Sequence, residues 1–377
     1  MNTFHRPPLW LLTLLIMFPQ LVETIYSPAL PGIATSYHVS SERAAQTLSV
    51  YFVAFAVGVA MWGWLSDCIG RRRAMMAGLL CYATGSLMAV VATDFSVLLL
   101  ARMVSAIGAA AGSVVVQTML RDSYESTALS RVFSVMGAAL ALSPVFGLLS
   151  GGWLVSLYGH TGVFIALVLL ALLLLMLMLT VTMLPETRPE HTLRPRLAAL
   201  LSRMARDYEL WKNAILVALL NTMLFSYYSL APFLFGQLGW SSRAFGLTGL
   251  LLAFASLSGS LLNQRLLTTG LTPEQLVRYA CALAALSGLV AWCLQHSAWI
   301  LIPVFGVVIA YGIAIPNVLS QALRHYREQA GAAGALFGLS YYLLLGMMLG
   351  FAGMVQQLGL VLSVCALLAW LCSLGRR

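Results

Sequence analysis

The sequence predicts an all-α membrane protein with twelve transmembrane helices in two six-helix bundles. Of its 377 residues, 60% are hydrophobic and only 9% are charged, and the mean hydropathy is +0.90. Such a composition is typical of a chain surrounded mostly by lipid. Apolar segments near the length that crosses a bilayer, about 20 residues, recur along the chain. A polar segment near its middle separates two sets of six.

Each predicted helix is an apolar segment bounded by polar or turn-forming residues. The twelve segments are 9–29, 44–65, 73–92, 95–117, 129–155, 162–184, 211–235, 244–265, 276–295, 298–320, 332–352 and 357–374. After the N-terminal apolar run, Glu23 and two prolines stand where a signal peptide would have small residues for cleavage. We therefore expect 9–29 to be a retained helix.

The distribution of Lys and Arg predicts the orientation, because short cytoplasmic loops are rich in both residues. With the N-terminus inside, most of them fall on the cytoplasmic side, and Arg43 and Arg243 face outward. We expect a multi-pass protein of the bacterial inner membrane with both termini in the cytoplasm. This orientation explains the net charge of +9, and no nucleic-acid partner is expected.

The segment from Pro185 to Asp207 contains three prolines and charges of both signs. It predicts a cytoplasmic linker, which divides the chain into a bundle at 1–184, a linker at 185–210 and a bundle at 211–377. Gly259 and Asn263 repeat the spacing of Gly63 and Asp67 at the end of the corresponding helix. The repeat is consistent with two related halves.

The loop between the second and third helices has a distinctive composition. Residues 63–73 read GWLSDCIGRRR, with an acid, two glycines and three arginines between two apolar segments. The loop resembles the G-x-L-x-D-R-x-G-R-R motif of the major facilitator superfamily, with Cys68 in place of an arginine. The resemblance implies the major facilitator fold, with a substrate site between the halves near the bilayer midplane.

Other segments resemble the drug:proton antiporter branch of this family, and within it the Bcr/CflA subgroup. Residues 24–31, TIYSPALP, are similar to D-x-Y-x-P-A-x-P, and Glu23 precedes the position of the acid. Residues 102–110 keep the arginine of R-x-x-Q-G-x-G as Arg102. Residues 143–152, SPVFGLLSGG, resemble the helix 5 motif S-P-x-x-A-P-x-x-G-G through Pro144, Gly147, Gly151 and Gly152. Residues 183–189 are similar to the P-E-T-R end of helix 6. Together these segments imply multidrug-type efflux coupled to protons.

Two charged residues are predicted well inside helices. Among 21 Lys and Arg and 12 Asp and Glu residues, only Glu23 and Arg102 have this position. A charge in the membrane costs roughly 2.5–3.5 kcal/mol on insertion scales and therefore suggests function. The two groups are expected about 10 Å below the outer interface, where a direct or water-mediated pair is feasible. Our hypothesis is that Glu23 carries the proton, and the alternative is a structural ion pair.

Polar and aromatic residues on four helices are the candidate lining of a substrate cavity. They are Gln20, Tyr26, Ser27, Asn221, Phe225, Tyr228, Tyr311, Asn317, Gln321 and Tyr341. The tyrosines, with Trp62, Phe52 and Phe55, suit a flat, apolar or weakly cationic ligand. For each polar residue, a hydrogen bond between helices is the alternative role.

The loop and the helix 5 motif are expected to serve conformational change. In the family the loop keeps the cytoplasmic side closed in the outward-open state, so the resemblance implies a latch. Its residues are Gly63, Asp67, Gly70, Arg71 and Arg72, with Arg121 or Arg131 as the partner of Asp67. The glycines of helix 5 allow tight helix contacts as the halves rock, and neither group is expected to touch substrate.

The leading hypothesis is a proton-coupled exporter of small, largely apolar or cationic compounds, working as a monomer without cofactor or metal. The alternative is a proton-coupled carrier for one small solute, such as a purine, an amino acid or a sugar. This alternative covers importers as well as exporters. A third class, a membrane enzyme or a sensor, is disfavoured. An intramembrane hydrolase would require a nucleophile–base set or metal ligands, and the predicted helices contain no histidine and no second carboxylate. A sensor usually carries an added soluble domain, and no predicted stretch is long enough for one.

Overall fold

The protein is described by a computed structural model that covers residues 7–124, 126–180, 185–187, 197–326 and 330–375. Its described elements are helices. The first passage across the bundle is formed by α1 (Leu9–Tyr26), η1 (Ser27–Ala29) and α2 (Leu30–Ser36) in series. Pro28 and Pro31 lie in the first turns of η1 and α2, where a missing backbone N–H is tolerated.

Apart from α7, the other elements follow the predicted segments closely. They are α3 (Ser41–Ile69), α4 (Arg71–Val90), α5 (Phe95–Ser123), α6 (Ser126–Thr180), α7 (Leu197–Ala205), α8 (Tyr208–Gln237), α9 (Ser242–Thr268), α10 (Pro273–Cys293), η2 (Ala298–Ile300), α11 (Leu301–Ala322), α12 (Ala330–Val355) and α13 (Leu358–Leu374). Ten described helical stretches are long and apolar enough to cross a membrane, one of them within α6, and α13 is a shorter apolar helix.

Helix α6 contains two of the predicted passages. Its backbone leaves the helical region at Gly159, with φ 65° and ψ −167°, a conformation that glycine adopts without steric cost. The kink lies between the predicted segments 129–155 and 162–184. Counting α6 twice, the described helices make twelve passages, as predicted.

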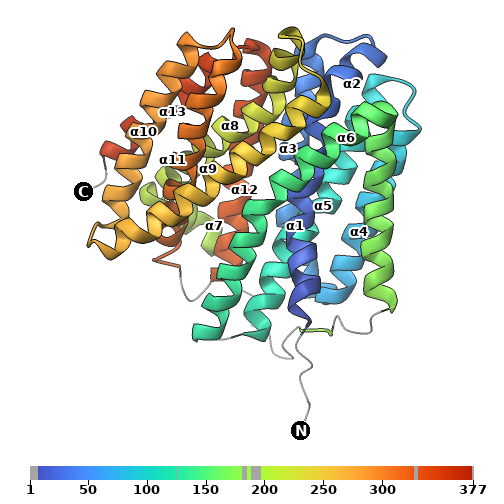
Figure 1. Cartoon of the computed structure of the whole chain (residues 1–377). Coiled ribbons are helices and arrows are strands. Elements are labelled where there is room, and N and C mark those ends of the chain that lie inside the picture. Colours follow the sequence, from blue (N-terminus) through green and yellow to red (C-terminus); the bar gives the residue numbers. More distant parts are fainter. Residues whose placement is uncertain (1–6, 125, 181–184, 188–196, 327–329, 376–377) are drawn as a thin grey trace.

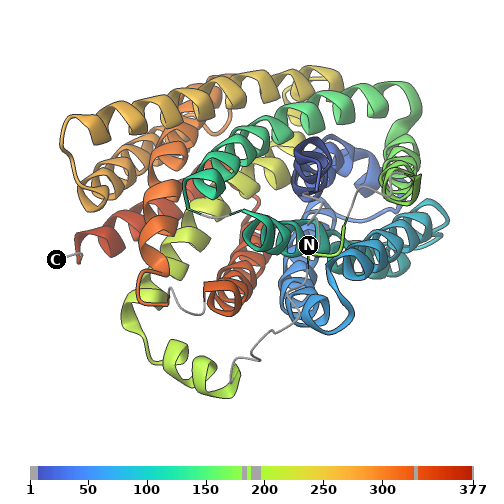
Figure 2. The same cartoon turned by 90° about the horizontal axis from the view of Figure 1, so that it is seen from below.

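The helices form two groups that lie side by side (Figure 1). In the N-terminal group, α1 packs on α5 and α6, and α5 packs on α3 and α4. In the C-terminal group, α8 packs on α11, α12 and α13, while α10 packs on α11 and α13. Between the groups, α3 packs along α12 and α6 crosses α9. Figure 2 shows these two seams on opposite sides of the bundle.

We use two names for the ends of the bundle. The linker end holds the start of α1, the α3–α4 turn, the start of α8 and α7, and it is the lower end in Figure 1. The opposite end holds the turns at 37–40, 91–94 and 238–241. At the linker end, the turn between α3 and α4 is the single residue Gly70, with φ 96°.

Helix α7 lies inside the segment predicted as a cytoplasmic linker. It is short and amphipathic, with Leu200 and Met204 buried. Tyr326 contacts the end of α7 and the residue that precedes α8. Its hydroxyl donates to Asp207 Oδ2 at 2.8 Å, and the guanidinium carbon of Arg203 lies 5.0 Å from its ring centroid. Burial and the hydrogen bond to the Asp207 carboxylate raise the pKa of Tyr326 to about 12. The tyrosine therefore remains a proton donor at ordinary pH.

Candidate functional site

A cavity of about 470 Å³ lies between the two groups of helices. Its lining comes from both groups, with α1, α3, α5 and α6 on one side and α8, α9, α11 and α12 on the other. On α5 the lining residues are Ser113 and Gln117, in the half of the helix nearer the linker end. On α11 they run from Val308 to Leu319, also toward the linker end. The cavity therefore occupies the middle of the bundle and its linker-end half.

The wall formed by the N-terminal group carries four polar residues. Gln20 and Glu23 on α1 and Ser113 and Gln117 on α5 line it. Glu23 is 5% exposed. Within the described part of the chain, its carboxylate has neither a hydrogen bond nor an ion pair. A buried carboxylate without a protein partner is available to a proton or to a cationic ligand.

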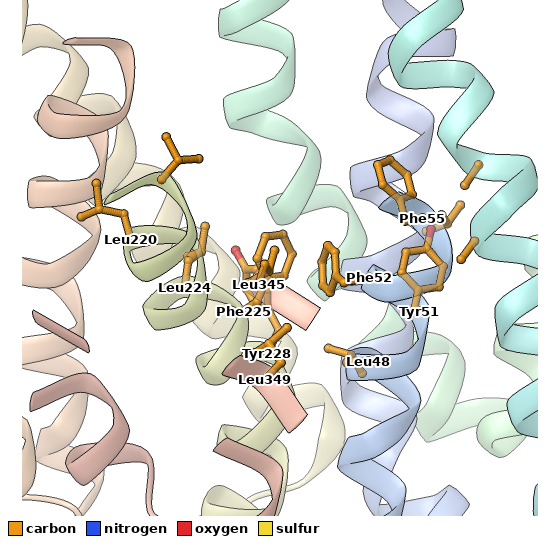
Figure 3. Packing of buried hydrophobic residues seen from close by; sticks show 14 of the residues in the cluster. Leu48, Tyr51, Phe52, Phe55, Leu220, Leu224, Phe225, Tyr228, Leu345 and Leu349 are labelled. Atoms are coloured by element: carbon orange, nitrogen blue, oxygen red, sulfur yellow. The ribbon is translucent and has the colours of Figure 1, made fainter. Parts of the chain in front are cut away.

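Aromatic rings close the cavity toward the opposite end. Phe52 projects from α3 toward Phe225 and Tyr228 on α8 (Figure 3), and the ring centroids of Phe52 and Phe225 are 4.5 Å apart. Tyr342 on α12 adds an edge-on contact with Phe55 at 4.9 Å. Edge-to-face contacts of this kind stabilise a packed layer. We call Phe52, Phe55, Phe225, Tyr228 and Tyr342 the aromatic layer.

Beyond the aromatic layer, the two groups touch directly. The Ser27 hydroxyl donates to the backbone carbonyl of Tyr228, which joins η1 to α8. The Ser49 hydroxyl donates to the Gly346 carbonyl at 2.7 Å, which joins α3 to α12. Gly152 of α6 meets the start of α9, where an added Cβ would lie 2.6 Å from the Ser242 carbonyl oxygen. The opposite end is therefore closed by contacts on several sides.

Six of the ten predicted cavity residues line this cavity: Gln20, Asn221, Phe225, Tyr228, Tyr311 and Tyr341. In the C-terminal wall, the Tyr311 hydroxyl donates to Asn221 Oδ1 at 3.1 Å. Asn221 Nδ2 donates to the Val217 carbonyl in its own helix at 2.8 Å. Both groups are therefore held in fixed positions at the cavity surface.

The other four predicted residues do not line the cavity. Ser27 lies beyond the aromatic layer, because the chain has already passed into η1 there. Tyr26 is fully buried inside the N-terminal group. Asn317 donates to Asn263 Oδ1 at 2.7 Å and joins α11 to α9, so its role is the hydrogen bond between helices named as the alternative. Gln321 lies in the last turn of α11, outside the lining.

Several lining residues were not predicted from the sequence. Tyr342 is adjacent to the predicted Tyr341, and both tyrosines reach the cavity. Ser113 and Gln117 are four residues apart on α5 and thus on one helix face. That polar pair was a usable signal, since polar residues in a transmembrane helix avoid lipid.

Arg102 does not form an ion pair with Glu23. Its guanidinium carbon lies 4.0 Å from the ring centroid of Tyr26 and 4.3 Å from that of Tyr51. In the described part of the chain, the ion pairs are Asp67–Arg71 and Arg71–Asp122. Aromatic faces attract a guanidinium when both are desolvated. Tyr26 and Tyr51 thus contact the Arg102 guanidinium where a direct pair with Glu23 was expected.

Around the α3–α4 turn, Asp67 pairs with Arg71 rather than with Arg121. Arg71 is almost fully buried, and its Nε donates to Asp122 Oδ2 at 2.9 Å. The side chain of Arg131 lies outside the described residues.

The segment after α6 braces the same turn. The backbone N–H of Arg71 donates to Glu186 Oε1 at 2.8 Å, and that of Arg72 donates to Glu186 Oε2 at 3.3 Å. The Thr187 hydroxyl donates to Asp122 Oδ2 at 3.3 Å. Gly63 lies beside Ala335 of α12, where an added Cβ would be 3.5 Å from the alanine Cβ. The turn is therefore braced within the N-terminal group and also borders the C-terminal one.

The helix 5 residues divide by the surface that they face. Gly147 and Gly151 pack against the backbone of α1 at Leu21 and Ile25. Gly152 packs against α9, in the other group. Pro144 lines the cavity, contrary to the expectation that this motif would not reach a ligand.

The sequence pattern of the Major Facilitator Superfamily matches residues 9–363. An uncharacterized transporter of Rickettsia bellii is 31% identical to the chain, with 92% of this chain and 89% of the relative covered. Multidrug resistance protein D of Escherichia coli is 26% identical, with 97% and 94% covered. A crystal structure of a POT family transporter in complex with 5-aminolevulinic acid superposes with a TM-score of 0.77 at 14% identity, covering 99% of this chain and 96% of that one. This structural likeness concerns the fold alone.

Proposed function

The chain belongs to the Major Facilitator Superfamily, and on that basis we propose that it is a proton-coupled exporter of small, largely apolar or cationic compounds. The similarity to multidrug resistance protein D supports export as the direction of transport and a broad substrate class. We also propose an alternating-access mechanism, in which the bundles at 1–184 and 211–377 rock against one another and expose the cavity to each side of the membrane in turn.

The observation that carries the proposal is the position of Glu23. It is the carboxylate of the cavity wall, and the described lining contains no basic residue. A proton or an organic cation each satisfies this buried charge, and both cannot do so at once. Competition for one carboxylate couples proton entry to substrate exit, which is antiport.

The chemistry of the two walls supports the substrate class. The aromatic layer offers ring faces to a flat apolar body, and ring faces attract cations. Gln20 and Gln117 add amides that hydrogen-bond polar substituents without selecting a charge. A ligand with an apolar body and one amine matches both walls.

The orientation follows from the charges at the two ends. Arg72, Arg73, Arg203 and Arg206 belong to the linker end, which we assign to the cytoplasm with both termini. The structure then corresponds to an inward-facing state, with its cavity on the cytoplasmic side and its aromatic layer closed. The protein acts as a monomer in the inner membrane.

Transport into proteoliposomes tests the proposal. With an acidic lumen, and with equal potassium on both sides and valinomycin to hold the membrane potential at zero, proton exit is expected to drive accumulation of tetraphenylphosphonium, and nigericin, which collapses the pH gradient, is expected to abolish it. Accumulation of one nucleoside, amino acid or sugar, with no response to cations or apolar dyes, would instead establish the carrier for a specific solute. This specific carrier is the second candidate function, because the amides of the cavity can hydrogen-bond such a solute. Accumulation that does not depend on the pH gradient would exclude proton coupling.

The braced turn at Arg71 is proposed as a conformational latch, and it yields a graded prediction. The side chain of Asp122 is 13% exposed and that of Asp67 is 51% exposed. Removing a buried partner of an ion pair leaves an uncompensated charge, which is more costly than removing an exposed one. We expect Asp122→Asn to slow transport roughly tenfold or more and Asp67→Asn to slow it less, with equilibrium ligand affinity unchanged in both. Transport rate and binding, measured on the same preparations, check this.

Asp94 provides the matched control on the same helix. It caps the other end of α5 by accepting from the backbone N–H groups of Ser96 and Val97 at 2.9 and 3.1 Å. Asparagine retains that capping role, so Asp94→Asn is expected to transport normally. A loss of ligand affinity in Asp122→Asn would contradict a latch role.

A further inference from the structure

A second set of polar groups lies outside the cavity, inside the N-terminal group. It consists of Tyr26 on α1, Tyr51 on α3, Tyr82 and Ser86 on α4 and Arg102 on α5, which we call the Arg102 cluster. All five residues are at most 3% exposed. Tyr26 and Tyr51 stack on Arg102, and Tyr82 interacts electrostatically with Arg102 and Tyr51. The cluster brings together four helices that are separate in sequence.

The polar atoms of the cluster have no hydrogen-bond partner among the described residues. They are the hydroxyls of Tyr26, Tyr51, Tyr82 and Ser86 and the Nε and Nη2 atoms of Arg102. Tyr82 and Ser86 are close polar neighbours, as are Tyr26 and Thr47, and these contacts supply no acceptor to the Nε and Nη2 atoms of Arg102. Buried polar groups are normally paired. Four unpaired hydroxyls and two unpaired atoms of the cation itself therefore indicate a ligand.

The geometry of Arg102 defines what that ligand must supply. The guanidinium carbon lies over the rings of Tyr26 and Tyr51. The Nε and Nη2 donors of the guanidinium have no acceptor among the described residues. The four hydroxyls add further O–H donors. The cluster thus has a net positive charge and an excess of donors, and it lacks an acceptor with negative charge.

We propose that the Arg102 cluster binds a small monovalent anion of the halide class, with chloride as the ligand available in cells. A halide accepts hydrogen bonds from several directions at once, and it neutralises a buried cation, which a water molecule does not. The burial of all five residues restricts the ligand to a small one. This anion site goes beyond the proposed transport function and does not depend on the identity of the exported compound.

Glu23 is the acidic group that acts on this cluster. It lies three residues before Tyr26 on α1 and interacts electrostatically with Arg102, Tyr51 and Tyr82. When Glu23 is ionised, its charge opposes an incoming anion, and when it is neutral that repulsion disappears. Anion binding and proton binding therefore favour each other, and this coupling is reciprocal.

Chloride titration of the purified, detergent-solubilised full-length protein tests the site. In sodium gluconate at constant ionic strength, calorimetry is expected to give saturable binding of chloride and bromide. Arg102→Gln should abolish it. Tyr51→Phe and Tyr82→Phe keep the rings and remove one donor each, so each is expected to weaken binding about three- to tenfold. Glu23→Gln is expected to tighten it roughly fivefold or more.

Tyr227→Phe is the matched control. The Tyr227 hydroxyl is also buried, but it donates to Thr248 in the C-terminal group at 2.8 Å, so chloride affinity should not change. Absence of saturable chloride binding would overturn the proposal, as would unchanged affinity in Tyr51→Phe and Tyr82→Phe. These two variants decide the question if Arg102→Gln does not fold. Chloride binding by a protein that fails to transport would leave the anion site standing and refute only the exporter proposal.

Discussion

Replacing Glu23 by glutamine is expected to eliminate proton release on ligand binding and to slow proton-driven export roughly a hundredfold or more, the scale of loss when a proton-exchanging group is removed. The amide has nearly the shape of the carboxylate but cannot exchange a proton with the cavity. Glu23 lines the cavity without a hydrogen bond or ion pair to the described residues, so the substitution breaks no such contact. The protein should fold and bind neutral ligands normally.

The measurement is the pH change of a weakly buffered solution of purified protein as a lipophilic cation is added. Wild type should release protons in proportion to occupancy, and Glu23→Gln should release none. Two variants serve as controls. Glu23→Asp keeps an acid and should retain part of the release. Gln20→Ala alters the same wall and should change affinity without changing the protons released per ligand bound. Full proton release from Glu23→Gln would assign the proton to another group.

The helices were predictable because their signal is local. Length and apolarity located eleven of the twelve segments within a few residues of the observed helices, and the turn between α12 and α13 falls at Gln356, with φ 53°, between the predicted segments 332–352 and 357–374. The non-helical backbone at Gly159 separates the two passages of α6, as the segments 129–155 and 162–184 predicted. One feature differed. Helix α7 is too short and too polar to resemble a membrane passage, and its order depends on burial of Leu200 and Met204.

The candidate site was only partly predictable, because it depends on helix rotation and on contacts between distant segments. The membrane position of Glu23 and Arg102 was evident from their charge, but whether they meet depends on how α1 and α5 face each other. Two tyrosines on α1 and α3 take the guanidinium instead. Similarly, Ser27 was assigned to the cavity face of α1, whereas the change to η1 directs it toward the Tyr228 carbonyl.

Gly152 is the position at which a single substitution is expected to shift the conformational equilibrium most. It lies where α6 of one group meets α9 of the other, and an added Cβ would be 2.6 Å from the Ser242 carbonyl oxygen and 3.1 Å from Gly246 Cα. Both atoms belong to the backbone and cannot rotate away. A leucine there overpacks the closed opposite end, typically by about 1–3 kcal/mol. Since about 1.4 kcal/mol is a tenfold change in an equilibrium, Gly152→Leu should move the population toward the outward-open state by roughly five- to a hundredfold.

Thiol labelling measures this shift in a background with the native cysteines replaced by serine. A cysteine at Ser27, which is fully buried beyond the aromatic layer, should become reactive in Gly152→Leu, while one at Gln117 in the cavity should become less reactive. Gly151→Leu is the matched control, because the neighbouring glycine packs on Ile25 of α1 inside the N-terminal group. Its overpacking should lower the unfolding temperature without moving either reactivity. Equal labelling changes in the two variants would mean that the α6–α9 contact does not govern closure of the opposite end. A selective response of Gly152→Leu would identify this glycine contact as the point where the closed state is most sensitive to side-chain volume.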